Sequence, residues 1–329
     1  MTEPIWISEA EVVGLMHLGQ AITALETGFL MESRGEAQNM IKTHVSWGHN
    51  NLHAIGASFV GADLVGTKTW AHTQGGACPL LILFDAETGA LKAIIECFAL
   101  GQMRTAGISG LATRMLALPE ASDMAIIGTG KQALAQVAAI AAVRPITRLR
   151  VYSRSMENRE AFIQKVREQF TFDVVNAPSI QAAVDGAHVI TLVTRATEAF
   201  LGEQMIAPRT HINAVGAITP EREEFFQDVF DRCSLIAVDS LPSTQKLSKE
   251  MITKFGGESS GWERVQPLSA LLANGVHRGN SDDLTLFKAM GVGISDLSLG
   301  AALYQRALVE GIGRSIPQPK KIKPRLTVN

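Results

Sequence analysis

A glycine-rich segment, Gly128-Thr129-Gly130-Lys131-Gln132-Ala133, has the GxGxx(G/A) spacing of a turn that binds a dinucleotide. The first glycine allows a tight turn, the second lets the backbone approach a pyrophosphate, and Ala133 allows a helix to pack closely on a strand. The start of the following helix offers free N–H groups and the positive end of its dipole. Since the apolar strand 124–127 precedes the turn, we predict a dinucleotide site rather than an ordinary strand–helix turn.

The segment Ser153-Arg154-Ser155 follows the second strand of this unit, where a protein distinguishes NAD from NADP. An acidic residue there would bind the ribose 2′-hydroxyl of NAD, whereas an arginine can accept the 2′-phosphate of NADP. The segment has Arg154 and no acid, which favours NADP. NAD remains open, because Arg154 can also lie on the face of the adenine.

Lys68 and Arg104 lie in segments that otherwise consist of apolar or small residues. Lys68 lies in Val65-Gly66-Thr67-Lys68-Thr69-Trp70, where a buried ammonium costs free energy unless it is paired or faces a cleft. A lysine at a strand edge with its charge in solvent is the alternative. Arg104 is expected to begin a helix that runs to Leu118, and a cation at a helix start is disfavoured unless an anion binds there.

The elements that must position these residues differ between two parts of the chain. Residues 121–300 alternate between strand and helix patterns, which predicts a parallel sheet covered on both faces. Right-handed crossovers then favour a Rossmann-type doubly wound α/β fold. The predicted strands are 124–127, 148–152, 188–193, 211–215 and 235–238, and the predicted helices are 131–143 and 155–170.

Residues 1–120 read as an α+β domain. Helices are expected within 8–34, followed by alternating strand patterns with glycine turns and a hairpin at 84–89. A last helix, 297–311, is expected to return to this domain. The predicted division is therefore 1–120 with 301–329, and 121–300.

Composition excludes several classes of protein. The chain is 46% hydrophobic with a net charge of −2, so it is globular and carries no field that would attract nucleic acid. Its three cysteines are widely spaced and no HExxH motif occurs, which predicts neither a disulfide framework nor a metal site. Without a signal-peptide pattern or an apolar run of about 20 residues, we expect a cytoplasmic protein with no membrane partner.

The order of these motifs resembles that of the ornithine cyclodeaminase/mu-crystallin family, over roughly residues 5–315. The stretches that match the family, besides the glycine turn, are Gly66-Thr67-Lys68, Leu83-Phe84-Asp85 to Thr88-Gly89, Arg104-Thr105-Ala106, Ile212-Asn213-Ala214-Val215-Gly216-Ala217, Val238-Asp239-Ser240, and Thr285-Leu286-Phe287-Lys288 to Asp296.

The resemblance implies a homodimer in which the domain 1–120 with 301–329 binds the substrate and forms the dimer contacts. Lys42, Lys68 and Arg104 would face a small amino or imino acid. The residues implied in cofactor binding are Arg104, Thr105, Gly128, Thr129, Gly130, Lys131, Gln132, Ala133, Ser153, Arg154, Ser155, Thr194 and Val215.

The chain departs from the cyclodeaminases of this family at one position. They carry a catalytic aspartate just after the Gly-Gly or Gly-Ala that follows the Asn-Ala-Val strand, where this chain has Ile218. An isoleucine cannot accept a proton or guide an amine. Ornithine cyclisation is therefore disfavoured, and imine reduction or amino acid dehydrogenation remains.

We accordingly predict an NAD(P)H-dependent enzyme that reduces the C=N bond of a small 2-imino acid, or reductively aminates a 2-oxo acid, to an L-amino acid. Lys42 and Arg104 would bind the carboxylate, and Lys68 would donate the proton. A cyclodeaminase with internally recycled NAD and a cofactor-bound, crystallin-like binding protein are the alternatives.

Three histidines, His44, His53 and His72, lie in the segment expected to form the pocket. Surface or core positions are the expectation for each of them. Should two of them line the pocket with Lys42, a dicarboxylic imine such as iminosuccinate, which would yield aspartate, becomes a candidate substrate.

Overall fold

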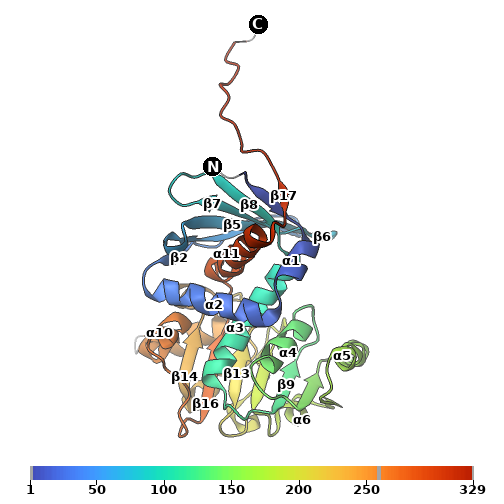
Figure 1. Cartoon of the computed structure of the whole chain (residues 1–329). Helices are drawn as coiled ribbons and strands as arrows, with labels where there is room; N and C mark the ends of the chain where they lie inside the picture. Colours follow the sequence, from blue (N-terminus) through green and yellow to red (C-terminus); the bar gives the residue numbers. More distant parts are fainter. Residues whose placement is uncertain (1–2, 258–260, 328–329) are drawn as a thin grey trace.

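Two β-sheets, separated by a layer of helices, make up the computed structural model, which describes residues 3–257 and 261–327 (Figure 1). The sheet of the N-terminal part lies at the top of Figure 1 and the parallel sheet at the bottom, with α2 (Leu18–Ser33) and α3 (Phe98–Leu116) between them. The predicted α/β class, a Rossmann-type parallel sheet with a second α+β part, is confirmed.

The first sheet has nine strands in the order β17-β1-β8-β7-β5-β4-β2, with β3 paired to β4 and β6 paired to β5. Within residues 3–257 and 261–327, β1 and β8 are the one parallel pair of this sheet and the other pairs are antiparallel. The strands are β1 Ile5–Ile7, β2 Ala37–Asn39, β3 Thr43–Trp47, β4 Asn50–Phe59, β5 Leu64–Thr73, β6 Gly76–Ala77, β7 Leu80–Asp85, β8 Leu91–Glu96 and β17 Arg314–Ser315.

Strand β5 carries Lys68 at the centre of this sheet. Lys68 pairs with Ile55 of β4 on one side and with Leu81 of β7 on the other. Because side chains alternate between the two faces of a strand, Leu64, Gly66 and Lys68 share one face. Helix α11 (Gly293–Glu310) covers β5 on this face, so Lys68 is buried beneath a helix.

The second sheet has eight strands in the order β11-β10-β9-β12-β13-β16-β14-β15, all parallel. Its central strands are buried along their whole length, as strands covered on both faces are. The strands are β9 Asp123–Ile127, β10 Arg148–Tyr152, β11 Asp173–Asn176, β12 Val189–Leu192, β13 His211–Ala214, β14 Cys233–Val238, β15 Val265–Pro267 and β16 Leu284–Lys288. The five predicted strands are confirmed; β11, β15 and β16 were not predicted.

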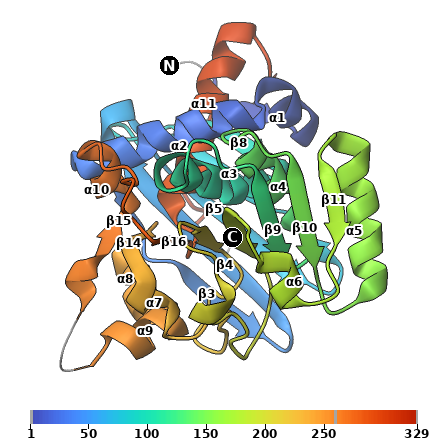
Figure 2. The same ribbon diagram turned by 90° about the horizontal axis from the view of Figure 1, so that it is seen from below.

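Figure 2 shows this sheet from below, with α4 and α5 toward one end and α7, α8 and α9 toward the other. The remaining helices are α1 Glu9–Leu15, α4 Ala133–Ala141, α5 Met156–Gln169, α6 Ile180–Val184, α7 Val229–Arg232, α8 Leu241–Leu247, α9 Lys249–Phe255 and α10 Leu268–Ala273, with short 3₁₀ turns η1 Val60–Ala62, η2 Glu203–Met205 and η3 Trp262–Arg264.

Helix α3 begins at Phe98, so the prediction that Arg104 begins a helix is wrong. The apolar residues before Arg104 continue the helix in the N-terminal direction, and Arg104 lies in its second turn. The unfavourable dipole at a helix start therefore does not explain this arginine, and its reason must be sought among its contacts.

Helix α11 begins at Gly293 rather than at the predicted Leu297, and it packs on α2, α3, β4 and β5. The predicted boundary at 300/301 therefore falls inside one helix. We propose a division before Gly293, which keeps the whole helix with the first sheet; residues 1–2, 258–260 and 328–329 of the predicted domains lie outside the described residues.

Across the described chain, no helix combines the length and apolar character needed to cross a membrane.

Candidate active site

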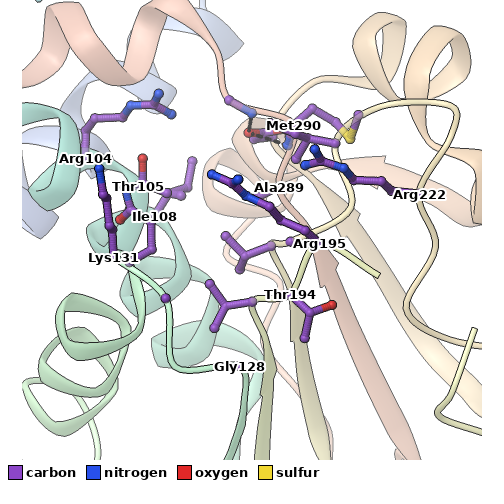
Figure 3. Close-up of a pocket in the computed structure, with 18 of the residues that line it drawn as sticks. Arg104, Thr105, Ile108, Gly128, Lys131, Thr194, Arg195, Arg222, Ala289 and Met290 are labelled. Carbon is purple, nitrogen blue, oxygen red and sulfur yellow. Dashed lines mark hydrogen bonds between the residues drawn. The ribbon is translucent and has the colours of Figure 1, made fainter. Parts of the chain in front are cut away.

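A cavity of about 610 Å³ lies between the two sheets, at the carboxyl ends of β9, β12 and β13 (Figure 3). Ligands of open α/β sheets bind at this edge, where the strand order reverses. The N-terminal part contributes Lys42, Ile55 and Trp70, and α3 contributes Arg104, Thr105 and Ile108. The parallel sheet contributes Gly128, Thr129, Gly130, Lys131, Gln132, Val193, Thr194, Arg195, Val215, Gly216, Ile218, Arg222, Asp239, Ala289, Met290 and Gly291.

The glycine turn after β9 has the shape that a pyrophosphate requires. Gly128 has φ +109°, and a Cβ there would lie 2.7 Å from the carbonyl oxygen of Val193. A Cβ at Gly130 would meet no atom within 4 Å, so the backbone at this point is open to the cavity. Helix α4 begins at Ala133, immediately after the turn. The turn therefore fits the phosphates of a dinucleotide, which would be held by backbone N–H groups and the helix dipole.

Several predicted cofactor residues lie outside the lining of this cavity. Ser153, Arg154 and Ser155 follow β10, the strand beside β9, and Ala133 is buried under the turn. Ser155 caps α5 by accepting a hydrogen bond from the N–H of Asn158. Arg154 is exposed and makes no ion pair within the described residues, so its guanidinium is available at the edge where an adenosine ribose would lie.

Lys68, Arg104 and Asp296 form a buried charged cluster. The Lys68 Nζ donates a hydrogen bond of 2.5 Å to the Asp296 Oδ1, and the Arg104 Nε lies 3.2 Å from the same oxygen. The side chain of Asp296 is fully buried and that of Lys68 is 5% exposed. Two cations thus share one carboxylate, which leaves a net positive charge for an anionic ligand.

Arg104 directs its remaining donors to the cavity. Its Nε lies 3.2 Å from the Asp296 Oδ1 as an ion pair without a hydrogen bond, and its two terminal nitrogens make no ion pair within the described residues. Gly291, at φ +80°, passes so close that a Cβ there would lie 3.0 Å from a terminal nitrogen. Arg104 is therefore held in place with a free edge that suits bidentate binding of a carboxylate.

Lys68 lines a smaller cavity of about 200 Å³ rather than the larger one. The two cavities adjoin, because Trp70, Arg104, Thr105, Lys131 and Gln132 line both. The Lys68 Nζ lies 5.1 Å from the centroid of the Trp70 ring. The predicted substrate residues are thus brought together, with Lys42 and Arg104 on the larger side and Lys68 behind them.

Burial lowers the pKa of Lys68, and the charge of Asp296 opposes this change. Burial also lowers the pKa of Lys42, reinforced by the charges of Arg104 and Lys68, although Lys42 as a residue remains exposed. A lysine whose pKa is lowered toward neutrality gives up its proton more readily than an ordinary lysine. Both amines are therefore suited to acid–base chemistry as well as to binding anions.

Asp239, which belonged to a matching stretch but was assigned no role, holds the loop beside Arg104. Its carboxylate accepts hydrogen bonds from the N–H groups of Met290 (2.8 and 3.0 Å) and Gly291 (2.7 Å). Burial raises its pKa, and these N–H groups oppose the rise. Asp239 therefore fixes the loop that passes against Arg104.

Glu224, a residue that the sequence did not single out, ties together two loops of the cavity. Its carboxylate accepts hydrogen bonds from the N–H and hydroxyl of Thr194 (both 2.7 Å) and from the N–H groups of Gly216 (3.0 Å) and Ala217 (3.1 Å). Burial raises its pKa, and the charge of Lys288 opposes this. The hydroxyl of Thr194, a predicted cofactor contact, is thus already donated to Glu224.

Replacing Glu224 by glutamine should lower the free energy of unfolding by about 1–3 kcal/mol, because one of the two acceptor oxygens becomes an NH2 group that faces N–H donors. The dissociation constant for the dinucleotide should rise as well, since the loops at 194 and 216 line the cavity. Thermal unfolding and cofactor titration measure the two effects. The matched control is Glu223→Gln, whose partly exposed pair with Lys249 should contribute less than about 1 kcal/mol. Equal behaviour of the two variants would contradict this role of Glu224.

The three histidines lie on the strands beside the site rather than in it. The His53 ring stacks on Trp70 with centroids 4.8 Å apart, and the His44 ring lies 5.6 Å from that of His53. Burial lowers the pKa of His53, with further contributions from the charges of Lys42, His44 and His72. None of the three lines either cavity, so the condition for assigning them to the substrate is not met.

Comparison with known proteins places these features in one family of sequences. The model of the ornithine cyclodeaminase/mu-crystallin family matches residues 3–311. A Delta(1)-pyrroline-2-carboxylate reductase of Bacillus cereus is 32% identical over 272 residues, which cover 80% of this chain and 81% of the relative.

Two solved structures share the fold. The Delta(1)-pyrroline-2-carboxylate reductase of Thermococcus litoralis, in complex with NADH and L-proline, has a TM-score of 0.87 at 24% identity, covering 95% of this chain and 100% of that one. The iminosuccinate reductase of Paracoccus denitrificans, in complex with NAD+, has a TM-score of 0.85 at 22% identity, covering 96% and 99%.

Proposed function

The chain belongs to the ornithine cyclodeaminase/mu-crystallin family, and we propose that it is an NAD(P)H-dependent oxidoreductase that reduces the C=N bond of a small 2-imino acid. The same chemistry would let it aminate a 2-oxo acid reductively, through the imine that forms with ammonia or an amine. The names of the similar reductases support this class of reaction. Iminosuccinate is one candidate substrate within the class.

The observation that carries the proposal is the cluster of Lys68, Arg104 and Asp296 beside the glycine turn. It joins a free guanidinium edge, a buried amine of lowered pKa and a dinucleotide turn within two adjoining cavities. Binding a carboxylate, donating a proton and holding a hydride carrier are the three tasks that imine reduction requires.

The residues would divide the reaction as follows. Arg104 and Lys42 bind the substrate carboxylate and so fix the imine carbon in the cavity. The glycine turn at 128–133 would hold a reduced nicotinamide dinucleotide, which would supply the hydride for the new C–H bond and would be oxidised to NAD(P)+. Lys68 donates the proton that completes the amine as the C=N π bond breaks, directly or through water, and Asp296 holds its ammonium in position. One hydride and one proton thus convert the imine to the amine.

NADPH is the cofactor we propose on the basis of Arg154, whose exposed guanidinium follows β10 where a 2′-phosphate would lie. The relatives in the comparison were solved with NADH or NAD+, so both cofactors belong in any assay.

A cyclodeaminase remains the less favoured alternative. Ile218 lines the larger cavity, and among the described residues of its lining Asp239 alone carries a carboxylate. The carboxylate of Asp239 is occupied by the backbone N–H groups of Met290 and Gly291. A free carboxylate that could guide a distal amine is therefore missing from the described lining.

The test is a spectrophotometric screen of Delta(1)-pyrroline-2-carboxylate and of 2-oxo acids with ammonia or methylamine, each against NADH and NADPH. The proposal expects stoichiometric oxidation of the reduced cofactor with at least one imine. Conversion of ornithine with no consumption of NAD(P)H would favour the cyclodeaminase, and no oxidation across the panel would favour a binding protein.

We also propose that the protein is a cytoplasmic homodimer, formed through the first sheet. Val45, Trp47 and Leu52 are 59%, 45% and 43% exposed on the β3–β4 hairpin, where Val45 pairs with Leu52. An exposed apolar patch of this kind is typical of an interface.

The double variant Val45→Glu/Leu52→Glu should convert the dimer to a monomer, because two charges per subunit would be buried without partners. Sedimentation velocity measures the change. Val13→Glu, at a residue 63% exposed on α1, serves as the control and should leave the dimer intact. A wild-type protein that sediments as a monomer would contradict the proposal.

A further inference from the structure

Two arginines that the proposed mechanism does not use project into the larger cavity. Arg195 follows β12 and Arg222 lies in the loop after β13, and both line the cavity. The two loops touch, because the N–H of Glu223 donates a hydrogen bond of 3.2 Å to the carbonyl of Ala196. Figure 3 shows both side chains directed from the parallel-sheet side toward the side that carries Arg104.

Neither guanidinium is neutralised by an ion pair within the described residues. The nearby carboxylates have other partners: Glu223 pairs with Lys249 at 2.6 Å, and Glu224 is bonded to Thr194, Gly216 and Ala217. Hydrogen bonds from the Thr219 side chain and from a backbone N–H lower the pKa of Glu221, and the charge of Arg222 adds only a lesser effect. Two positive charges therefore face the cavity without a carboxylate bound to them.

A substrate with a single carboxylate would not use these charges. Its carboxylate is accounted for by Arg104 and Lys42, and the pyrophosphate of a dinucleotide by the glycine turn, the start of α4 and Lys131. Arg195 is exposed and Arg222 half-buried, and two cations that line one cavity make its potential positive and so favour an anion there. Arg195 and Arg222 are thus left over when a dinucleotide and a monocarboxylate have been placed.

We propose that Arg195 and Arg222 form a second anion-binding site, and that the enzyme therefore acts on imino acids that carry a second carboxylate. The inference rests on the proposed imine reduction and specifies its substrate class. The first carboxylate binds at Arg104 and the second at the Arg195–Arg222 pair, on the opposite side of the cavity. Ile218 and Met290, which line the cavity, provide apolar surface for the methylene groups between the two carboxylates.

Pairs of substrates that differ in the second carboxylate test the second anion-binding site. Oxaloacetate and 2-oxobutanoate, each assayed with ammonia, form the first pair: oxaloacetate has a second carboxylate where 2-oxobutanoate has a methyl group. 2-Oxoglutarate and 2-oxopentanoate form a second pair that differs in the same way and is one methylene longer. The wild-type enzyme should prefer the dianionic member of one pair in kcat/KM. The double variant Arg195→Met/Arg222→Met should lower that kcat/KM by roughly 10- to 100-fold or more, because charge-assisted hydrogen bonds are lost. For the methyl analogue, kcat/KM of the double variant should stay within about threefold of the wild-type value, because the methyl group makes no charged contact with either arginine.

Binding gives a readout that does not depend on turnover. Calorimetric titration of the enzyme with NAD(P)+ should show L-aspartate or L-glutamate binding more tightly than L-asparagine or L-glutamine, and the double variant should abolish the difference. Lys165→Met, which removes an exposed charge from α5 outside the cavity lining, is the control and should keep it.

The outcomes distinguish a failure of the proposed imine reduction from a failure of the second anion-binding site. If no imine of either pair is reduced, and Delta(1)-pyrroline-2-carboxylate is not reduced either, the proposed function fails. If imines are reduced but the dianion preference is absent from the wild type, or survives in the double variant, only the second anion site fails. A double variant whose KM for NAD(P)H rises equally with both members of a pair, with an unchanged preference, would assign the arginines to the cofactor phosphates and overturn the inference.

Discussion

Replacing Lys68 by methionine should lower kcat by about 10²- to 10⁴-fold, the usual contribution of a positioned general acid. Lys68 is the buried amine nearest Asp296, and burial lowers its pKa. Methionine keeps the length of the side chain and removes the proton. The dissociation constant for NAD(P)H should change little, because the glycine turn is untouched. Steady-state kinetics and a fluorescence titration of the cofactor measure the two quantities.

Two further variants separate chemistry from folding at Lys68. Removing the ammonium deprives the buried Asp296 of its hydrogen bond and leaves it paired with Arg104 alone, which should lower the free energy of unfolding by about 1–3 kcal/mol. Lys68→Gln keeps a hydrogen-bond donor for Asp296 but has no dissociable proton, so it should recover stability without recovering activity. Lys68→Arg keeps the charge, but a guanidinium does not give up its proton near neutral pH, so kcat should stay low. A stable variant of either kind with near wild-type kcat would remove Lys68 from the chemistry.

The pH profile reports on the same amine. A proton donor acts only while protonated, so kcat/KM should fall as pH rises through the pKa of Lys68. Because burial lowers this pKa, the fall should begin below the ordinary value of 10.5. If the residual kcat/KM of Lys68→Met falls at the same high pH as that of the wild type, the titrating group is not Lys68.

Replacing Arg104 by methionine should lower kcat/KM for the imino acid by about 10²- to 10⁴-fold, since two charge-assisted hydrogen bonds are worth roughly 1.5–3 kcal/mol each. The ion pair of Arg104 with Asp296 uses its Nε, and Arg104 lines the cavity, so the terminal nitrogens are available to the carboxylate. Much of the loss should appear as a higher KM for the substrate. Arg104→Lys should recover only part of it, because an ammonium cannot bind a carboxylate bidentately.

Arg114 provides the control on the same helix. Its guanidinium pairs with Glu26 at 2.7 Å, with both side chains about one-third exposed, so Arg114→Met should change kcat/KM by less than about threefold. Partial rescue of Arg104→Met by added guanidinium ion would further tie the loss to the missing group. Equal kinetics of the Arg104 and Arg114 variants would show that α3 matters for stability alone.

The local part of the site could be predicted from sequence because its signals are short. The turn at 128–133, the strand before it and the helix after it are consecutive, and all three lie where the spacing indicated. Lys68 stood out because a lysine in an apolar strand requires a partner. Arg104 was singled out for a reason that proved wrong, since α3 begins at Phe98.

The other residues of the site could not be predicted, because their places depend on contacts between distant parts of the chain. Asp296 meets Lys68 across 228 positions, and no local pattern distinguishes that aspartate from one on a solvated helix. Glu224 follows two other glutamates, Glu221 and Glu223, and only the fold buries it under the loops at 194 and 216. Arg195 and Arg222 converge only because β12 and β13 are neighbours, and sheet order is fixed by tertiary packing.

The transfer of deuterium from the cofactor to the product tests the central claim most directly. Delta(1)-pyrroline-2-carboxylate, or the best imine of the screen, is reduced with NAD(P)H carrying deuterium at nicotinamide C4, and the amino acid is analysed by mass spectrometry. We predict one deuterium on the α-carbon for each NAD(P)H oxidised, from one of the two C4 epimers of the cofactor. An amino acid formed without deuterium from either epimer, or no oxidation with any imine, would contradict the account.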